Sequence, residues 1–370
     1  MVKRRIYSVG LGLGLAAVAL GGCATQGGDG AEGSSETALR PQVVATTSVL
    51  CDLTQQVAED TIALTCLMAP GQDPHTYQAR PSDRQAVDDA DLVLYDGYNF
   101  APSVLRVVAA SRNPAPKVAV LEAAVPSPLM GQGHDHDHDH EASDHDNHDA
   151  VADHDHDHDH AHDHEASGQT SEATEAPIDS ADQVPDPHVW HNARHNAAIA
   201  EVIAEALAQV NPDQASRYQA NAAQLTDQFI ALDGWMQAQA ATVPAPNRRL
   251  VTTHDAFRYF AEAYDFEVKG ALSGLSTDAQ PSPKALTALV DQIKAATVPA
   301  IFAESTTNPA LIQTVANNAG VAVADQPLMV EGPGGPDSAA PNTQAMLVVN
   351  TCTIVNALGG TCNEADSPLN

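Results

Sequence analysis

Short apolar runs alternate with amphipathic helical patterns along most of this chain, and this alternation limits the folds that it can adopt. The runs are three or four residues long, as expected of strands that are buried on both faces of a parallel sheet. The helical patterns between them are long enough to be crossover connections. Two sets of four such units predict an α/β fold with two doubly wound (β/α)4 lobes. The expected strands lie near 43–45, 62–64, 92–95, 118–121, 250–252, 268–271, 300–303 and 321–323, and the expected helices near 49–59, 82–90, 102–112, 256–264, 283–296, 308–319 and 342–357.

A longer helical pattern separates the two sets of units. It begins near Asn211-Pro212-Asp213 and ends before Val243-Pro244, and its apolar positions are spaced alternately by four and three residues. About 28 residues at about 1.5 Å each would reach roughly 42 Å, which is enough to connect two lobes. We therefore place a helical region with the linker helix at 196–245, between an N-terminal lobe at 41–195 and a C-terminal lobe at 246–370.

A low-complexity segment at about 131–185 interrupts the first lobe. It alternates histidine with aspartate and has almost no large apolar residue, so we predict a disordered inserted loop. Neutral imidazoles bind divalent cations near neutral pH, and we expect this loop to collect Zn²⁺ weakly as an accessory metal site. The alternative is an inert solvated spacer. The twelve histidines of this low-complexity segment are His134, His136, His138, His140, His145, His148, His154, His156, His158, His160, His162 and His164.

The charge balance of the chain excludes some classes of partner. The sequence has 17 Lys+Arg against 48 Asp+Glu. Such an acidic surface argues against nucleic acid and against an anionic membrane surface as partners, and it attracts cations without specificity.

The N-terminus has the three parts of an export signal. Lys3-Arg4-Arg5 is a positive region, a short apolar core follows, and Leu20-Gly21-Gly22-Cys23 resembles the cleavage site of bacterial lipoproteins. The apolar core is too short to span a bilayer, which needs about 20 residues. We expect a signal peptide at 1–22, lipidation of Cys23 and a flexible tether at 23–40, so that a lipid anchors the protein on the periplasmic, extracytoplasmic face of a bacterial membrane. An ordinary secretory peptide with a chance cysteine is the alternative.

Four further cysteines would lie in an oxidising compartment if the chain is exported. Four cysteines allow three pairings. The local pairing, Cys51 with Cys66 and Cys352 with Cys362, is favoured because the partners of each pair are near in sequence. Metal binding by these cysteines is less favoured, since no Cys-x-x-Cys spacing occurs.

Histidines follow several of the expected strands. Two identical triplets, Asp73-Pro74-His75 and Asp186-Pro187-His188, each present an imidazole on a backbone that proline stiffens. His254 comes directly after the strand at 250–252, and the matching position of the last unit is the segment 327–331. Because sites in open α/β sheets form outside the carboxyl ends of the strands, we expect these four places to meet in a cleft between the lobes.

The segments that carry these histidines resemble a known family. Gly71–Tyr77, Asp186–Trp190 and Thr253–Phe260 look like the motifs of ZnuA-like, metal-specific solute-binding lipoproteins that serve zinc and manganese ABC importers. The resemblance covers 42–360 and is specific in the combination of its motifs. It implies two (β/α) lobes joined by one long α-helix, a metal site in the interlobe cleft, and an ABC transporter membrane permease as the partner.

The resemblance also implies the metal ligands. His75, His188 and His254 match the first three ligand positions of the family. The fourth is usually Asp, whereas the matching residue here is Glu331, with Asp337 as the fallback. Three imidazoles and one carboxylate suit tetrahedral Zn²⁺ better than Mn²⁺, which prefers more oxygen ligands. We expect zinc as the transported ion, with manganese as the alternative.

Other residues near these motifs have two interpretations each. His191 and His195 are either part of a second metal site or, as we favour, helix-surface histidines near the main site. Asp73 and Asp186 are expected to be hydrogen-bond partners of the ligands rather than ligands.

The resemblance and the ligand types predict a zinc-binding transport protein without catalysis. A zinc-dependent hydrolase is the rival class, because three histidines can leave an open position for water. Against it, no nucleophile–base pair and no His-Glu-x-x-His motif occurs in the chain, and a fourth carboxylate would close the site. A metal-dependent adhesin or an extracellular metal buffer is a third possibility.

Overall fold

The computed structural model describes residues 40–132, 183–278 and 281–369. The expected signal peptide, the tether, Cys23 and the twelve histidines of the low-complexity segment lie outside these residues. Within the described ranges, no helix is both long enough and apolar enough to cross a membrane.

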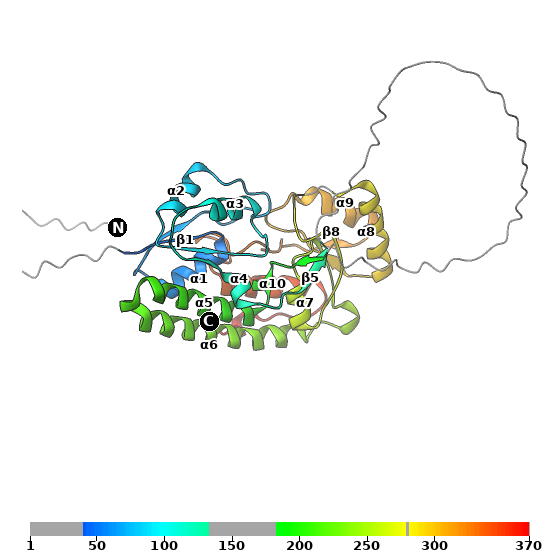
Figure 1. The fold of residues 1–370 in the computed structure, drawn as a ribbon. Coiled ribbons are helices and arrows are strands. Elements are labelled where there is room, and N and C mark those ends of the chain that lie inside the picture. Colours follow the sequence, from blue (N-terminus) through cyan, green and yellow to red (C-terminus); the bar gives the residue numbers. More distant parts are fainter. Residues whose placement is uncertain (1–39, 133–182, 279–280, 370) are drawn as a thin grey trace, which may run out of the picture. The chain divides into compact units, whose positions relative to one another are not determined.

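The first half of the described chain is a parallel sheet with helices on both faces (Figure 1). The strand order is β2-β1-β3-β4, and all three pairings are parallel. Side chains alternate between the two faces of β1: Val43 and Ala45 pack toward α1, while Val44 packs toward α2 and α3. The elements are β1 (Gln42–Ala45), α1 (Ser48–Ala58), β2 (Ala63–Cys66), α2 (Pro81–Asp89), β3 (Leu92–Tyr95), α3 (Pro102–Ala110), β4 (Lys117–Ala119) and α4 (Val120–Ala124).

The second half repeats the βα alternation. β7 pairs with β8 and β9 with β10, both in parallel, and the amide of Phe302 donates to Val251 O at 2.9 Å, which connects the two pairs. The α/β class predicted from the apolar runs is confirmed. The elements are β7 (Arg249–His254), α7 (Arg258–Tyr264), β8 (Glu267–Ser273), α8 (Pro283–Ala296), β9 (Ala300–Ile301), α9 (Pro309–Ala319), β10 (Ala322–Val323) and α10 (Thr343–Ala357), followed by η5 (Glu364–Asp366).

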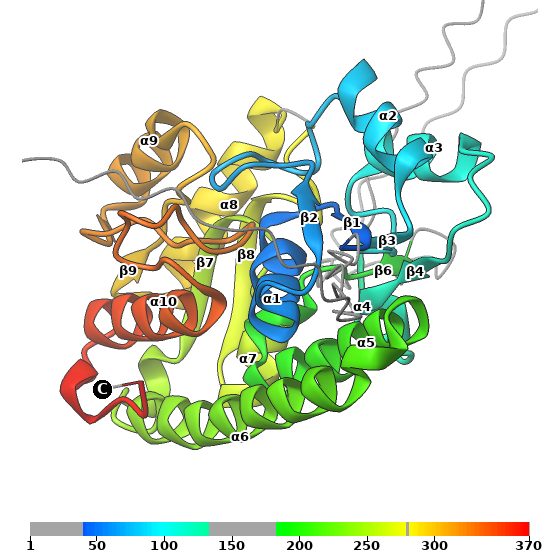
Figure 2. The same cartoon turned by 90° about the vertical axis from the view of Figure 1, so that its left-hand side faces the viewer.

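Two helices lie between these halves. They are α5 (Ala193–Val210) and α6 (Ala215–Ala240), with the short turns η2 (Val189–His191), η3 (Pro212–Gln214) and η4 (Ala245–Asn247) around them. At 26 residues, α6 is close to the length predicted for the linker helix and spans about 39 Å. It packs against α1 and α5 on the one hand and against α7 and α10 on the other (Figure 2).

The largest apolar core is shared by both halves. Leu50 and Trp190 from the first half lie in the same cluster of buried side chains as Phe257, Phe302 and Met346 from the second. A continuous packed interior resists small relative displacements, because its side chains interdigitate at high density. Residues of both halves are therefore held by one core.

Two expectations about element boundaries were wrong. Val120 and Leu121, expected in a strand, begin α4 instead, since a buried apolar run fits a strand or a helix equally well. The inserted segment is narrower than 131–185, because β5 (Met130–Gln132) and β6 (Gln183–Pro185) pair as an antiparallel ladder at its base.

Both disulfides of the favoured pairing are present. Cys51 in α1 is bonded to Cys66 at the end of β2, with a Cα–Cα distance of 5.8 Å. Cys352 in α10 is bonded to Cys362 in the segment after that helix, with a Cα–Cα distance of 5.1 Å. These are the local links that short sequence separation favoured.

Candidate metal site

Four side chains from four different segments meet at one buried point. His75 lies in the connection between β2 and α2, His188 follows β6, His254 is the last residue of β7, and Glu331 lies between β10 and α10. None is more than 8 % exposed. One nitrogen or oxygen atom from each lies within 4.8 Å of the others. The convergence expected from the strand ends is therefore present.

The separations of these atoms fit a small four-coordinate cation. The Nε2 atoms of His75 and His254 lie 3.3 and 3.2 Å from Nε2 of His188. Glu331 Oε1 lies 3.4 Å from His254 Nε2 and 3.8 Å from His75 Nε2. A tetrahedral Zn²⁺ with bonds of about 2.0–2.1 Å needs ligand atoms about 3.3–3.4 Å apart. These four separations lie close to that range, and the remaining pairs of the group lie within 4.8 Å.

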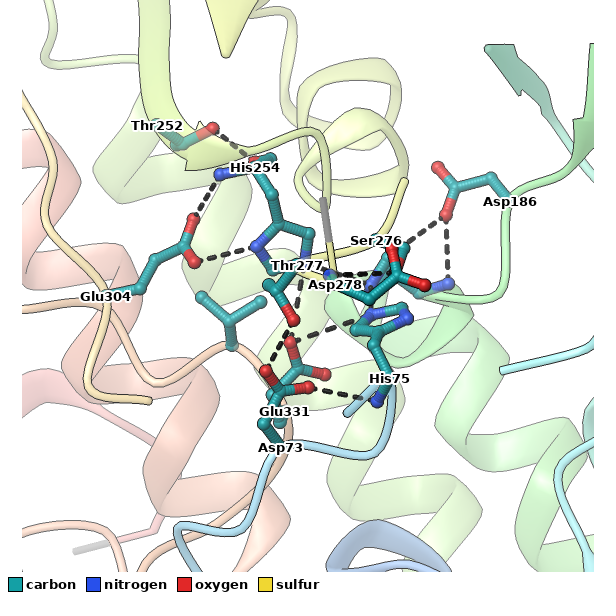
Figure 3. Close-up of polar contacts among 12 residues, drawn as sticks. Asp73, His75, Asp186, Thr252, His254, Ser276, Thr277, Asp278, Glu304 and Glu331 are labelled. Carbon is teal, nitrogen blue, oxygen red and sulfur yellow. Dashed lines mark hydrogen bonds and ion pairs between the residues drawn. The ribbon is translucent and has the colours of Figure 1, made fainter. Parts of the chain in front are cut away.

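Two of the imidazoles are oriented by buried carboxylates. Asp186 Oδ1 lies 2.8 Å from Nδ1 of His188. Glu304 Oε2 lies 2.7 Å from Nδ1 of His254 (Figure 3). An Nδ1–H that donates to a carboxylate leaves the lone pair of Nε2 for another partner. Both lone pairs then face each other across 3.2 Å, a contact that only a proton or a metal cation makes favourable.

Burial sets the protonation of this cluster. Burial lowers the pKa of His254, but the carboxylates of Glu304, Glu331 and Asp73 together outweigh burial and raise that pKa to about 9. Burial raises the pKa of Glu331 to about 8. Burial and the neighbouring His254 hold the pKa of His188 well below its usual range. A cation that binds near neutral pH would thus displace protons from His254 and Glu331.

Glu331 has no hydrogen-bond partner for either carboxylate oxygen within the described residues. A buried carboxylate without such partners is costly, and its pKa rises as a result. The carboxylate is directed at His254 and His75 instead. A bound cation would supply the missing interaction.

Two interior side chains, Trp190 and Asn350, hold the backbone just before Glu331. The indole of Trp190 donates to Val330 O at 2.9 Å. The side-chain amide of Asn350 both accepts from the amide of Met329 at 2.9 Å and donates to its carbonyl at 2.7 Å. These bonds use backbone groups that would otherwise be unpaired in the interior.

The backbone around Glu331 is also fixed from α1. Ser48 Oγ donates to Glu331 O at 3.2 Å. Gly332 follows with a φ of 136°, and a Cβ at this position would lie 2.2 Å from Ser48 Oγ. Only glycine fits here, because both the conformation and the space exclude a side chain. The carboxylate of Glu331 is thus held toward the histidines by the loop itself.

The two Asp-Pro-His triplets form the same local turn. Asp73 Oδ1 accepts from the amide of His75, and Asp186 Oδ1 accepts from the amide of His188, both at 2.9 Å. The triplets differ in their remaining contacts. Asp186 also reaches the ring of its histidine, whereas Asp73 Oδ2 accepts a hydrogen bond from Thr277 (Figure 3). Each aspartate thus accepts from the backbone amide of the histidine two residues later, and only Asp186 also bonds an imidazole.

The structure distinguishes the candidates for the fourth position. Glu331 belongs to the cluster, whereas Asp337 lies exposed in the turn at 336–337. Glu304 was not anticipated, although it follows the strand β9 as closely as the other candidates follow theirs. The strand-end rule that placed His254 would have pointed to it.

The expectation of helix-surface histidines was wrong for His191. Its ring is fully buried and stacks on Phe257 with centroids 4.3 Å apart. His195 is partly buried on α5, with Nδ1 3.1 Å from Val189 O. Neither belongs to the group of four convergent side chains. A turn of 3-10 helix before α5 rotates His191 into the core, which helical periodicity alone would not reveal.

Comparisons with known proteins agree with this arrangement. The family described as zinc-uptake complex component A, periplasmic, matches residues 43–357. The manganese-binding lipoprotein MntA of Halalkalibacterium halodurans is 28 % identical over 333 residues, which are 90 % of this chain and 93 % of that protein. The zinc-binding protein TroA of Treponema pallidum is 29 % identical over 307 residues, covering 82 % of this chain and 81 % of TroA.

A solved structure extends the likeness to the fold. The periplasmic zinc-binding protein TroA of Treponema pallidum superposes with a TM-score of 0.69 at 26 % identity, over 86 % of this chain and 99 % of that structure. The family match spans most of the chain, from β1 to the end of α10. The chain therefore belongs to the ZnuA family, the metal-binding solute-binding proteins of ABC importers, which are not enzymes.

Proposed function

We propose that this protein captures Zn²⁺ outside the cytoplasmic membrane and delivers it to an ABC-type permease. His75, His188, His254 and Glu331 would be the ligands of the ion. The observation that supports this most directly is the 3.2 Å contact between two Nε2 atoms whose rings are each oriented by a carboxylate on Nδ1. This arrangement directs two lone pairs at one point.

Zinc is preferred over manganese because of the ligand types and their spacing. Three imidazole nitrogens and one carboxylate oxygen within 4.8 Å of one another suit a tetrahedral ion. Mn²⁺ prefers a larger share of oxygen ligands. The names of relatives support both ions, since MntA is named for manganese and TroA for zinc. Manganese is therefore the second candidate.

The place of action follows from the N-terminal sequence and from the relatives. Lys3-Arg4-Arg5, the apolar core and Leu20-Gly21-Gly22-Cys23 have the order of a lipoprotein signal. Several relatives are named as lipoproteins. We infer an extracytoplasmic protein whose Cys23 carries the lipid, with domain boundaries at about 23–40 for the tether and 41–370 for the two lobes and their linker.

Metal content and competition titrations test the proposal. Protein purified after exposure to equal Zn²⁺ and Mn²⁺ should contain one tightly held Zn²⁺, resistant to a chelator that removes weakly bound ions. His75→Ala, His188→Ala and His254→Ala should each lose this equivalent and keep the fold. His195→Ala is the matched control and should retain it. A variant that binds with full affinity would remove that histidine from the site, and tight Mn²⁺ instead of Zn²⁺ would establish the alternative.

Delivery needs a separate measurement. A cell that lacks this protein should take up radiolabelled zinc slowly at limiting concentration, and the intact gene should restore uptake. The His254→Ala variant should fail to restore it at equal abundance. Restoration of uptake by the His254→Ala variant would show that zinc transport does not need this histidine.

A further inference from the structure

Tyr259 is placed to act on the site without touching it. It lies in the first turn of α7, in the C-terminal half of the chain, and is only 1 % exposed. Its hydroxyl accepts a hydrogen bond from the amide of Leu129 at 2.9 Å and donates one to Asp186 O at 3.1 Å. Burial raises the pKa of Tyr259 above its usual range, so the hydroxyl remains a donor.

These two partners are the ends of the β5–β6 ladder. Leu129 immediately precedes β5 and Asp186 immediately follows β6, and the amide of Asp186 donates to Leu129 O at 2.8 Å. The hydroxyl therefore bridges the two chain segments at the end of the ladder from which the chain continues to His188. It does so where the chain, after the histidine-rich insertion, rejoins the triplet that carries His188.

Two other contacts hold the same ladder to the C-terminal half. The guanidinium of Arg258 donates to Met130 O at 3.1 Å while it pairs with Asp255. A Cβ on Gly131 would lie 2.6 Å from the side chain of Leu275, so the strand approaches that side chain closely. The base of the insertion is thus docked on residues that follow β7 and β8.

The fixed peptide is the one that orients the ligand. Asp186 accepts from both the amide and Nδ1 of His188 through the same carboxylate oxygen, at 2.9 and 2.8 Å. Its second carboxylate oxygen has no hydrogen-bond partner within the described residues. The orientation of this carboxylate therefore depends on how firmly the backbone of Asp186 is held, and Tyr259 holds its carbonyl.

We propose that Tyr259 is a positioning residue for the metal site, which fixes the Asp186 peptide so that His188 keeps its orientation. The inference rests on the proposed function, and it adds a residue that acts across the halves of the chain. Loss of the hydroxyl leaves the buried carbonyl of Asp186 and the partly buried amide of Leu129 without this partner, and it frees the Asp186 carboxylate to tilt.

Tyr264 provides a matched control on the same helix. Its hydroxyl is also buried, accepts from the amide of Ala193 and donates to Asp233, both at 3.3 Å. Tyr259→Phe and Tyr264→Phe therefore each remove one buried hydroxyl with two hydrogen bonds. Only the first touches the ladder and Asp186. Both variants are expected to lower the melting temperature by a similar amount.

The test compares the two full-length variants with the wild type. Zn²⁺ affinity, measured against a chelator that masks weak sites, should fall on the order of tenfold in Tyr259→Phe, as expected when a support of a ligand is lost. It should stay within about twofold of wild type in Tyr264→Phe. Unchanged affinity in Tyr259→Phe, or an equal fall in both variants, would overturn the proposal.

A second readout does not depend on metal. In metal-free protein, the Nδ1 proton of His188 should give a downfield NMR signal that disappears in His188→Gln. This signal should shift or broaden in Tyr259→Phe and keep its position in Tyr264→Phe. If the wild type holds no tight Zn²⁺, the proposed function fails, and this signal still decides the role of Tyr259: an unchanged signal in Tyr259→Phe refutes it.

Discussion

Glu304 contacts His254 twice, because its Oε2 lies 2.7 Å from Nδ1 of the ring and its Oε1 accepts from the backbone amide at 2.8 Å. One carboxylate thus fixes both the backbone and the ring of the same histidine. Both side chains are fully buried, so water does not compete for these bonds. Burial lowers the pKa of His254, and Glu304 together with Glu331 and Asp73 raises it to about 9.

Replacing this carboxylate should weaken metal binding without removing a ligand. We expect Glu304→Gln to lower Zn²⁺ affinity by roughly 10- to 100-fold, because a neutral amide has one acceptor oxygen for the two donors of His254 and does not increase the basicity of the ring. Glu205→Gln, on the exposed face of α5, is the control. Chelator competition measures both, and equal affinities for the two variants would contradict a supporting role for Glu304.

The assignment of Glu331 as the fourth ligand can be tested by changing the charge and the length of its side chain. Glu331→Gln should lower Zn²⁺ affinity by more than about 100-fold, since loss of a ligand should cost more than loss of its support. Glu331→Asp keeps the charge and withdraws it by one methylene, so an intermediate loss is expected. Asp337→Asn should bind as the wild type does. A large loss in Asp337→Asn with normal affinity in Glu331→Gln would reverse the assignment.

Asp96 makes the stability of the fold depend on pH. Burial raises its pKa to about 6, although the hydroxyls of Thr46 and Thr47 donate to it at 2.6 and 2.8 Å. The unfolded value is about 3.9, so the folded protein binds the proton more tightly. This contribution to stability is complete below about pH 4 and is lost as the pH rises through about 6.

Asp96→Asn removes this dependence. The unfolding free energy of the variant minus that of wild type should rise by about 3 kcal/mol between about pH 4 and pH 7, which corresponds to a shift of about two pKa units. Denaturant titrations with a chelator present would measure it. A flat difference for Asp96→Asn over the same range would contradict the buried-proton account.

The sequence allowed the convergence of the ligands to be predicted because strand ends in an α/β sheet meet at one edge. The Asp-Pro-His triplets singled out His75 and His188, and the expected strand ends brought them together with His254. In the structure His188 follows β6 of the antiparallel ladder rather than a strand of the parallel sheet. Glu304 follows the same rule and was overlooked only because no motif marked it. The choice between Glu331 and Asp337 could not be made from the positions of the strand ends. It depends on tertiary contacts of the loop, such as the indole of Trp190 on Val330, which no local pattern encodes.

The elements were predictable where length and periodicity agreed. The pattern in α6 was long and regular, and its extent was close to the prediction. Val120 and Leu121 were misassigned because a short buried run has no periodicity that separates strand from helix. The ladder of β5 and β6 was missed because its residues are few and belong to a polar, low-complexity context.

The last prediction concerns the histidine-rich segment, whose twelve histidines lie between the two strands of that ladder. Because the four convergent side chains belong to other segments, a variant with all twelve histidines replaced by Asn should keep the tightest Zn²⁺ affinity and lose the weaker equivalents. Asn keeps the length of the insertion and leaves β5, β6 and the contacts of Tyr259 in place.

In the wild type, the weak equivalents should be lost between roughly pH 6 and pH 5, since an imidazole with a pKa of about 6.5 cannot bind metal once protonated. Titration calorimetry of both proteins at pH 7.5 and pH 5.5 would measure this, and loss of the tightest equivalent in the Asn variant would mean that the insertion supplies ligands to the main site.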